Sequence, residues 1–543
     1  MDANTYVGPD YDVVVAGGGP VGLMLACELA LGGAHVVVVE RLTTVDPTIK
    51  AGSLNTPTVE AFYRRGLLPA LAEEQRRTMD EIDAFARQPR PAGAPEGEPA
   101  GAPAGAMRKP AGHFAGIMLS ADQVDPADPA FADLGPAATV TLVSQQQVER
   151  ILGEHAARLG VELRRGVELT GFEEDAQGVT VHTRGPADGP ADVAIRAGWL
   201  VGCDGGRSTV RKLAGIAFPG TDPQITAHQA MVGMTGAEAL SPGWNWTDTG
   251  TYVHGPVPGR ILTVEFDRPS ADRESPVTAE ELQESLRRVS GVDVTITEVR
   301  SATRFTDNAR QASTYRKGRV LLAGDAAHVH SPFGGQGLNL GIGDAMNLGW
   351  KLASVVGGRA PEELLDSYTA ERHPIGAWVL DWTRAQVALM RPTPHTRALR
   401  GVVAELAGTV DGTTSIVKRL SGVWQRYDLP GDHPLVGRSA PDLELADGSR
   451  LADHLHSGRA LLLDLADDPR LRERARRYGD RVVVLTAACP DRPELAGLLV
   501  RPDGFTAWAA DRPGDDAAGA TALGATLARW LGAPTAPVPG PQH

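Results

Sequence analysis

The sequence predicts an α/β protein built on a Rossmann-like βαβ unit, with a β-rich domain inserted later in the chain. Residues 11–16 and 35–39 are short, continuous apolar runs, which are typical of parallel strands covered on both faces. Residues 23–33 between them have helical spacing and end in two glycines, a common helix stop. Residues 215–302 contain segments of alternating polarity, as half-buried antiparallel strands do.

Length and composition indicate a soluble, multi-domain enzyme. The chain has 543 residues, 42% of them hydrophobic and 22% charged, and a prior of roughly 150 residues per domain predicts about three or four domains. A net charge of −14 argues against nucleic acid or an anionic membrane surface as a partner. There is no apolar run of about 18 residues and no signal-like N-terminus, so we expect a cytoplasmic protein.

Cysteine and histidine usage gives no sign of a metal or redox centre. Cys27, Cys203 and Cys489 are too few and too far apart for a disulfide framework, and no CxxC occurs. No His, Cys and carboxylate cluster has metal-ligand spacing, so we expect no metal. His328 and His330 lie beside a glycine-rich motif, where we expect structural roles for them.

A glycine fingerprint lies between the first strand and the first helix. Gly17 permits a tight turn, Gly19 lets the backbone approach a pyrophosphate, and Gly22 lets helix pack on strand. Glu40 ends the second strand, where it suits ribose hydroxyls, and Arg41 beside it is either an adenine contact or a solvated side chain. The fingerprint predicts a dinucleotide site, and the alternative is a glycine-rich turn without a ligand.

A second motif favours FAD over NAD. Asp325 follows the apolar run 319–323 and suits a hydrogen bond to a ribityl hydroxyl. The glycine cluster at 334–337 allows the backbone to approach a flat ring closely. The helix that begins near Leu338 points its positive end at the same place, which would stabilise an anionic reduced flavin.

A third motif, Asp204-Gly205, follows the strand that ends at residue 201. By itself it predicts only a turn. In chain order, with the glycine fingerprint first, Asp204-Gly205 next and Asp325 last, the three motifs resemble those of the FAD-dependent aromatic hydroxylases, the single-component (group A) flavoprotein monooxygenases. The resemblance spans about residues 8–390 and is densest over residues 304–353.

The C-terminal tail resembles the thioredoxin-like domain of one subgroup of that family. The subgroup modifies polycyclic aromatic polyketides and includes anthracycline, angucycline and tetracycline hydroxylases and rifampicin monooxygenases. Because this tail lacks CxxC, we expect a packing or interaction domain without redox activity.

The resemblance and the composition together imply a domain plan. A segment at 88–112, rich in Pro, Gly and Ala, is expected to be a flexible surface loop. We expect an FAD-binding domain from residues 1–75, 136–214 and 303–394, a substrate domain from residues 76–135 and the β-rich 215–302, a helical linker at 395–430, and a thioredoxin-like domain at 431–543.

The resemblance also implies flavin contacts at matching positions. Lys50 stands where relatives usually have Arg, which keeps the charge but loses the bidentate fork, and it is the candidate catalytic residue as well as a flavin-side candidate. The implied contacts are Gly17, Gly19, Pro20, Val21 and Gly22 with the pyrophosphate; Glu40 and Arg41 with the adenosine half; Gln145 with the ribityl region; Asp325 with the pyrophosphate and ribityl chain; Asp204 and Gly205 from the third motif; and Pro332, Gly335, Gly337, Leu338 and Asn339 around the isoalloxazine.

Aromatic residues of the β-rich domain are candidates for the substrate side. Trp244 and Trp246 suit stacking on a polycyclic ring, although packing is the more common role, and Phe114 is expected to border the same pocket. The Trp-x-Trp pattern is similar to that of flavin-dependent halogenases, but Thr247 and Asp248 follow it instead of an apolar residue and proline. Halogenation is therefore not favoured.

The resemblance implies an NAD(P)H-dependent monooxygenase reaction. NAD(P)H reduces the flavin, molecular oxygen forms a flavin C4a-hydroperoxide, and the distal oxygen hydroxylates a polycyclic aromatic polyketide. No second GxGxxG is present, so the nicotinamide visits transiently. Alternatives are Baeyer–Villiger oxygen insertion on the same scaffold and, more remotely, a flavin-binding partner without turnover in a biosynthetic complex. We expect a monomer or a homodimer.

Overall fold

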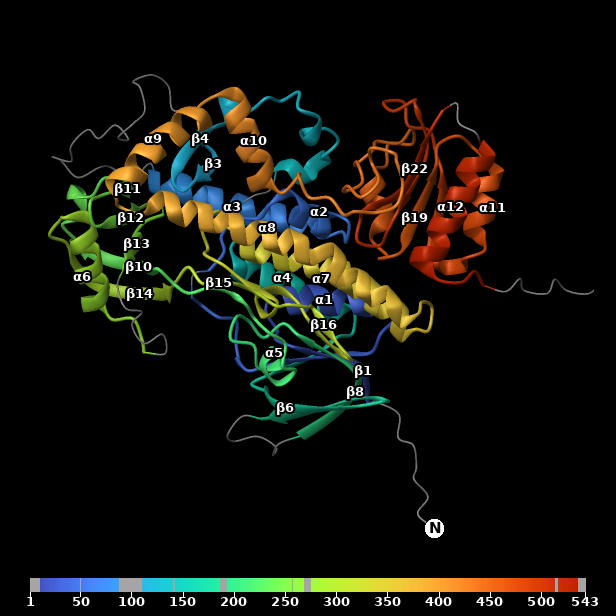
Figure 1. Cartoon of the computed structure of the whole chain (residues 1–543), viewed down its shortest axis with the longest axis horizontal. Coiled ribbons are helices and arrows are strands. Elements are labelled where there is room, and N and C mark those ends of the chain that lie inside the picture. Colours follow the sequence, from blue (N-terminus) through green and yellow to red (C-terminus); the bar gives the residue numbers. More distant parts are fainter. Residues whose placement is uncertain are drawn as a thin grey trace, which may run out of the picture.

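The computed structural model describes residues 10–48, 50–86, 110–139, 142–185, 193–255, 257–267, 275–512 and 516–535. Figure 1 shows a central helix-covered sheet, an antiparallel sheet at one end and a C-terminal α/β unit at the other. The predicted α/β class is therefore confirmed. Most of the expected loop at 88–112 lies outside the described residues, and its end, from Pro110 onward, belongs to a strand.

The central sheet has eight strands, with the path β16-β17-β8-β1-β2-β5 and with β7 and β6 added beside β8. Val13, Val14 and Val15 of β1 are fully buried, as expected for a strand covered on both faces. The strands are β1 (Tyr11–Ala16), β2 (Val36–Glu40), β5 (Glu162–Arg165), β6 (Glu168–Asp175), β7 (Gly178–Arg184), β8 (Val193–Gly202), β16 (Arg316–Lys317) and β17 (Val320–Leu322).

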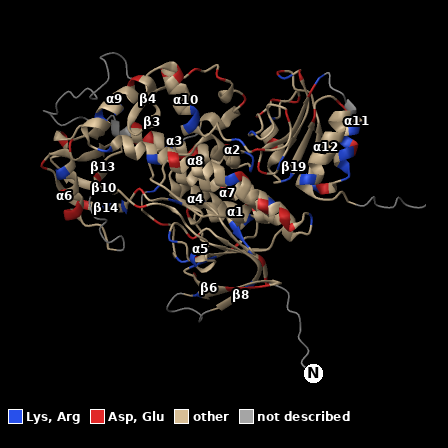
Figure 2. Ribbon diagram, viewed as in Figure 1, with Lys and Arg blue, Asp and Glu red and all other residues tan. Residues whose placement is uncertain are grey.

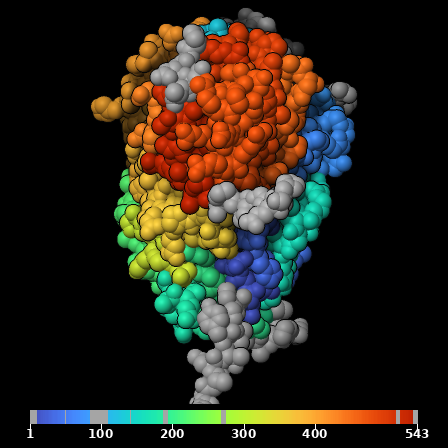
Figure 3. Space-filling model, turned by 90° about the vertical axis from the view of Figure 1, so that its right-hand side faces the viewer, coloured from blue at the N-terminus to red at the C-terminus, as the bar shows by residue number. Residues whose placement is uncertain are grey.

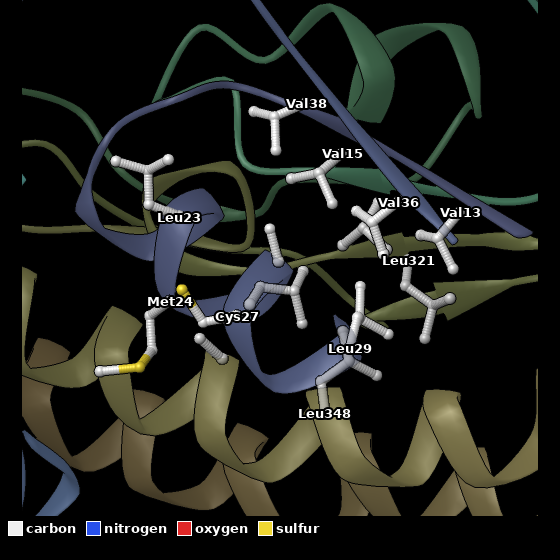
Figure 4. Close-up of a cluster of buried hydrophobic side chains, with 14 of the residues drawn as sticks. Val13, Val15, Leu23, Met24, Cys27, Leu29, Val36, Val38, Leu321 and Leu348 are labelled. Atoms are coloured by element: carbon white, nitrogen blue, oxygen red, sulfur yellow. The ribbon is translucent and has the colours of Figure 1, made fainter. Parts of the chain in front are cut away.

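Helices stack against this sheet, and two glycines bring α1 and α7 close together. A methyl group on Gly341 would lie 2.5 Å from a Val21 methyl, and one on Gly349 would lie 2.3 Å from Glu28 Cβ. Figure 4 shows α1 side chains packed between the valines of β1 and β2 and Leu348 of α7. The helices of this part are α1 (Pro20–Leu31), α2 (Thr56–Tyr63), α3 (Leu68–Ala86), α4 (Gln145–Arg158), α5 (Thr209–Leu213), α7 (Gln336–Val356) and α8 (Asp366–Met390).

The inserted sheet is antiparallel, in the order β11-β12-β13-β10-β14. Helix α6 covers its outer face, where Leu282 and Leu286 pack against Val232 and Ile261. The opposite face, which we call the inner face, packs toward α8 and the glycine cluster of the second motif. The elements are β10 (Ile225–Thr235), β11 (Gly243–Trp246), β12 (Gly250–His254), β13 (Arg260–Phe266), α6 (Ala279–Ser290) and β14 (Thr295–Phe305).

Short strands and two further helices complete this region. A small sheet in the order β18-β15-β9 lies between the two large sheets, and a hairpin of β3 and β4 lies beside α9 and α10. The expected helical linker thus holds two separate helices. These elements are β3 (Pro110–Phe114), β4 (Ile117–Ser120), β9 (Gly220–Thr221), β15 (Ala309–Gln311), β18 (His328–Val329), α9 (Pro394–Ala407) and α10 (Val410–Ser421).

The C-terminal unit has a four-stranded mixed sheet in the order β20-β19-β21-β22. Figure 3 shows this unit, in red and orange, as a rounded body above the yellow helices. In Figure 2, basic residues crowd α11, although the chain as a whole is acidic. The elements are β19 (Ala460–Asp464), α11 (Pro469–Arg476), β20 (Val482–Thr486), β21 (Leu495–Val500), β22 (Thr506–Asp511) and α12 (Asp516–Leu531).

Candidate functional site

The three glycine-rich motifs meet at one edge of the central sheet. Strands β1, β8 and β17 are parallel neighbours, with Ala16 opposite Gly202 and Gly202 opposite Leu322. The loops that follow them therefore emerge side by side, and Cys203 N donates to Ala16 O over 2.7 Å. This carboxyl edge is where open α/β sheets bind ligands.

The glycines of the first motif differ in whether the fold leaves room for a side chain. Gly17 has a φ of +111°, and a methyl group on it would lie 2.3 Å from Cys203 O. A methyl group on Gly22 would lie 1.9 Å from Gly17 O. Both positions therefore require glycine for the fold. Gly19 has a φ of −75°, and a methyl group on it would meet nothing within 4 Å, so its backbone faces open space at the start of α1.

The predicted adenosine-side residues lie next to this loop. Glu40 is half-buried at the end of β2, and its carboxylate accepts from Gly18 N over 2.7 Å and from Leu42 N over 2.8 Å. Arg41 is exposed. Pro20 and Val21 form the first turn of α1, whose free N–H groups face the same space as Gly19.

The second motif presents one exposed acid on a rigid turn. Asp325 is exposed, while its neighbours Gly324 and Ala326 are buried. The turn is anchored from α7, because Asp344 accepts from Gly324 N over 3.1 Å and from His328 Nε2 over 2.6 Å. Asp325 is thus held with its carboxylate toward solvent at the site, whereas His328 is fully buried in a structural role.

A buried arginine completes this anchor. Arg372 Nε donates to Asp344 Oδ1 over 2.8 Å, and Arg372 Nη2 donates to Leu340 O over 2.8 Å. Burial would raise the pKa of Asp344, but the charges of His328 and Arg372 hold that pKa below its usual value. Asp344 is therefore an anion that three donors satisfy. Sequence reasoning assigned no role at the site to Asp344 or Arg372, because their partners are distant in the chain.

The candidates expected around the isoalloxazine lie at residues 332–339, at the start of α7, and we call these residues the ring-side segment. Asn339 Oδ1 accepts from Asn55 N over 2.9 Å, and Asn339 Nδ2 donates to Gly335 O over 2.7 Å. Gln145 N donates to Ala51 O over 2.9 Å. Of the remaining candidates, Pro332 is exposed, Gly337 is half-buried and Leu338 is buried.

Lys50 is partly exposed and is paired with an acid. Its Nζ pairs with Asp46 Oδ2 over 2.8 Å, and 46% of its side chain is exposed. In the third motif, Asp204 Oδ2 accepts from Val210 N over 3.1 Å, while Oδ1 is buried with no hydrogen-bond partner among the described residues. Gly205 has a φ of +80° and open space at its Cβ position.

The predicted substrate-side aromatics join a cluster that reaches the second motif. Phe114 packs on Trp382, with ring centroids 4.5 Å apart. Trp244 lies 6.2 Å from both Trp246 and Phe333. Because Phe333 lies between Pro332 and the glycine cluster, the inner face of the inserted sheet meets the ring-side segment through this residue.

Sequence reasoning missed several residues of this cluster, including Phe333, Phe305 and Trp382. Phe333 was available as the aromatic residue within the second motif, and Phe305 as the end of an alternating strand. In the part of the chain that the structure describes, no three His, Cys, Asp or Glu side chains gather as metal ligands. No described helix is both long and apolar enough to cross a membrane.

The site has the features that a flavin dinucleotide requires. The backbone is open at Gly19, the Asp325 carboxylate is exposed on a fixed turn, and Asp204 has a buried oxygen to satisfy. Comparison with known families agrees with this geometry. A family described as "FAD binding domain" matches residues 10–383, and one described as "Aromatic-ring hydroxylase, C-terminal" matches residues 433–534.

Similar proteins match nearly the whole chain. A 12-dehydrotetracycline 5-monooxygenase/anhydrotetracycline 6-monooxygenase from Streptomyces rimosus is 41% identical, over 96% of this chain and 99% of that protein. A dialkyldecalin synthase from Streptomyces rugosporus is 37% identical, over 96% and 98%. The solved structure of OxyS anhydrotetracycline hydroxylase from Streptomyces rimosus aligns with a TM-score of 0.80 at 38% identity, covering 97% of this chain and all of that one. The chain therefore belongs to the FAD-dependent aromatic hydroxylase family, as its glycine motifs predicted, and is a flavoprotein monooxygenase.

Proposed function

We propose that this enzyme hydroxylates a polycyclic aromatic polyketide, with FAD as cofactor, NAD(P)H as reductant and molecular oxygen as oxidant. NAD(P)H is the co-substrate typical of the family, and the oxygen chemistry belongs to the bound flavin. The proposal is supported by the names of relatives that act on tetracycline intermediates. One observation carries it: an aromatic inner face that touches the ring-side segment through Phe333.

The proposal assigns a role to each part of the chain. We propose that the central sheet is a Rossmann-like FAD domain, the inserted sheet a substrate domain, and the C-terminal unit a thioredoxin-like domain without CxxC, with the boundaries expected from the sequence. The glycine loop and Glu40 hold the dinucleotide, and Asp325 binds the pyrophosphate and ribityl chain. The start of α7, at Gly335 to Asn339, lies against the isoalloxazine and directs its positive end there.

The protein's own contribution is orientation and exclusion of water. Trp244, Phe305 and Phe333 supply flat apolar surface on which an electron-rich ring would stack near the flavin. Lys50 remains the candidate for a charged contact at the flavin edge. Its half-exposed position suits a side chain that meets a transient nicotinamide better than one that takes part in the oxygen transfer.

A substrate-panel assay tests this function. The purified protein, loaded with FAD, is mixed with NADH or NADPH and a panel of hydroxylated anthraquinones, naphthacenes and angucyclinones. We expect at least one member to accelerate nicotinamide oxidation and to give a product with one added oxygen. NMR of the product then shows a new phenol for hydroxylation or a lactone for Baeyer–Villiger insertion. Flavin binding without stimulated oxidation by any member would favour a flavin-binding partner without turnover.

A further inference from the structure

The hairpin of β3 and β4 ends in a tight turn that packs against the inner face of the inserted sheet. Figure 1 shows this hairpin beside α9 and α10, and its two strands are joined by only two residues, Ala115 and Gly116. A methyl group on Gly116 would lie 2.3 Å from the Trp246 ring and 2.9 Å from the Trp244 ring. These two residues, which we call the hairpin tip, therefore lie against the aromatic pair expected on the substrate side.

Ala115 has a backbone conformation that alanine rarely adopts. Its φ is +48° and that of Gly116 is +74°, as a two-residue turn of type I′ requires. Among the described residues other than glycine, four have a positive φ, and the other three are aspartates, which tolerate it better. Such a conformation persists where the surrounding structure imposes it. The contacts of Ala115 therefore show what holds the hairpin tip in place.

Both backbone polar groups of Ala115 are bound by side chains from other elements. Ala115 N donates to Gln386 Oε1 on α8 over 3.0 Å, and Arg400 Nη1 on α9 donates to Ala115 O over 2.9 Å. Ala115 and Gln386 are both fully buried. Because buried backbone groups without partners cost free energy, these two side chains fix the position of the hairpin tip.

The other end of the Gln386 amide holds the ring-side segment. Gln386 Nε2 donates to Phe333 O over 3.2 Å, and it lies 3.2 Å from the position that a methyl group on Gly334 would take. A backbone N–H can only donate and a carbonyl can only accept, so the two contacts also fix which end of the amide is the oxygen. One buried side chain thus joins the hairpin tip to the ring-side segment.

Gln386 is one of three amide side chains that hold successive carbonyl groups of this segment. Gln336 Nε2 donates to Gly334 O over 3.1 Å, and Asn339 Nδ2 donates to Gly335 O over 2.7 Å. Because a peptide unit is planar, a fixed carbonyl also fixes the direction of the N–H group across the same peptide bond. Gln336 and Asn339 belong to α7 itself, whereas Gln386 connects the segment to the hairpin tip.

The surroundings of Gln386 would suit an apolar side chain better than an amide. Its two partners, Ala115 and Phe333, belong to one buried hydrophobic cluster, as does Val387, the next residue on α8. A buried amide avoids a cost in free energy only when its hydrogen bonds are made. The two hydrogen bonds are therefore what favours glutamine at this position.

We propose that Gln386 is a positioning residue that couples the inner face of the inserted sheet to the flavin. A polycyclic ring stacked on Trp244 displaces the hairpin tip, and Gln386 passes this displacement to the Phe333 carbonyl and so to the backbone beside the isoalloxazine. The surroundings of the flavin thereby depend on whether the inner face is occupied. The inference rests on the proposed function for the positions of the isoalloxazine and the substrate.

A double-mutant cycle tests this coupling without turnover. Gly116→Ala displaces the hairpin tip, because its methyl group collides with the Trp246 ring, and Gln386→Met keeps the size of the side chain but loses both hydrogen bonds. FAD is titrated into each apoprotein, and its visible absorption band reports the surroundings of the isoalloxazine. We expect Gly116→Ala to weaken FAD binding about fivefold in the wild-type background and less than about twofold in Gln386→Met, since residues of one network couple by such amounts. The band should shift only in the wild-type background.

The control is a second buried glutamine that also binds α8. Gln311 is 7% exposed, and its Nε2 donates to Tyr315 Oη over 2.7 Å and to His373 O over 2.9 Å. In the described part of the chain, it bonds neither the hairpin tip nor the ring-side segment, so Gln311→Met should leave the effect of Gly116→Ala unchanged. Should Gly116→Ala fail to fold, Arg400→Gln takes its place, because it displaces the tip by removing the donor to Ala115 O.

Two outcomes would overturn the proposal. If Gly116→Ala weakened FAD binding equally in both backgrounds, the hairpin tip would act without Gln386. If it changed neither the affinity nor the absorption band in the wild-type background, the hairpin tip and the flavin would be independent. Because FAD binding is measured in the oxidised protein without substrate, the result does not depend on whether the enzyme hydroxylates a polyketide, which the substrate-panel assay tests separately.

Discussion

At the scale of single residues, the fingerprint glycines divide into those that the fold needs and one that the ligand needs. Gly19 has open space at its Cβ position and an ordinary negative φ. We therefore expect Gly19→Ala to leave folding intact but to place a methyl group where the pyrophosphate approaches the backbone. FAD affinity should fall at least tenfold, as measured by titration of the apoprotein, while the apoprotein melting temperature changes little.

Two other glycines serve as controls for this substitution. Gly153 in α4 also has open space at its Cβ position, so Gly153→Ala should leave FAD affinity unchanged and stabilise the helix slightly. Gly17→Ala should instead impair folding, because its methyl group would collide with Cys203 O. If Gly19→Ala bound FAD as tightly as the wild type, the pyrophosphate would not lie at this loop.

The sequence was most informative at this scale. The spacing of Gly17, Gly19 and Gly22 predicted a site because all three glycines act within one short loop, so a sequence motif is enough to identify them. Trp382 was not predictable in the same way. Its contact with Phe114 is recognised only in the folded structure, because the two residues lie on α8 and β3, far apart in the chain.

At the scale of elements, α7 holds the second motif in place through Asp344. We expect Asp344→Asn to weaken FAD binding about tenfold, because the turn that carries Asp325 loses its anionic anchor. The substitution also leaves Arg372 buried without a counter-charge, so the apoprotein should be destabilised by about 3 kcal/mol. FAD titration and urea unfolding of the apoprotein measure the two effects separately.

An exposed acid provides the comparison for this prediction. Asp366 on α8 pairs with Arg316 but is 71% exposed at its side chain, so Asp366→Asn should change stability by less than about 1 kcal/mol and FAD affinity not at all. Should Asp344→Asn destabilise the protein yet bind FAD normally, the anchor would serve the fold alone.

The helices and strands themselves followed largely from periodicity and caps, but their partners did not. The run from 339 to 356 was expected to be helical, and the observed helix α7 begins three residues earlier, at Gln336. The tertiary structure decides which surfaces come together. It alone brings α1 close to Gly341 and Gly349 and forms the hydrogen bond between His328 and Asp344. Likewise, β21 was not anticipated, because its apolar run LAGLLV has no alternation to separate it from a buried helix segment.

At the scale of the whole molecule, buried charges join the C-terminal unit to the central helices. Arg65 binds Glu28 in the central unit and also donates to Leu455 O and Pro502 O in the C-terminal one. Arg501, which follows β21, donates to Glu371 on α8 over 2.7 Å. The tail was predicted as a distinct domain from its resemblance to a thioredoxin-like domain, but these contacts make it part of the support for α7 and α8.

Glu371 is the acid through which α8 takes part in this contact between the two units. It accepts from Arg501, from Asn347 over 2.6 Å and from Lys351 Nζ over 3.0 Å, and only 8% of the residue is exposed. Burial would raise the pKa of Glu371, but Arg501 and Lys351 bring it down to about 2. Since the pKa is lower in the folded state, the carboxylate stabilises the protein above its ordinary pKa near 4.5, and this stabilisation is lost as the pH falls toward 2.

We therefore expect Glu371→Gln to lower the free energy of unfolding by about 3 kcal/mol at neutral pH, because Lys351 would stay buried without its partner acid and Arg501 would keep only Asp503. The difference from the wild type should shrink as the pH falls from about 4.5 toward 2, since the wild type then loses the same charge. Urea unfolding at a series of pH values measures this difference, with Glu362→Gln, at a half-exposed acid paired with Arg316, as the control. A destabilisation that is the same at every pH would mean that Glu371 acts through its shape and hydrogen bonds and not through its charge. Ion pairs between Glu371 and the buried cations would then not be what holds the C-terminal unit.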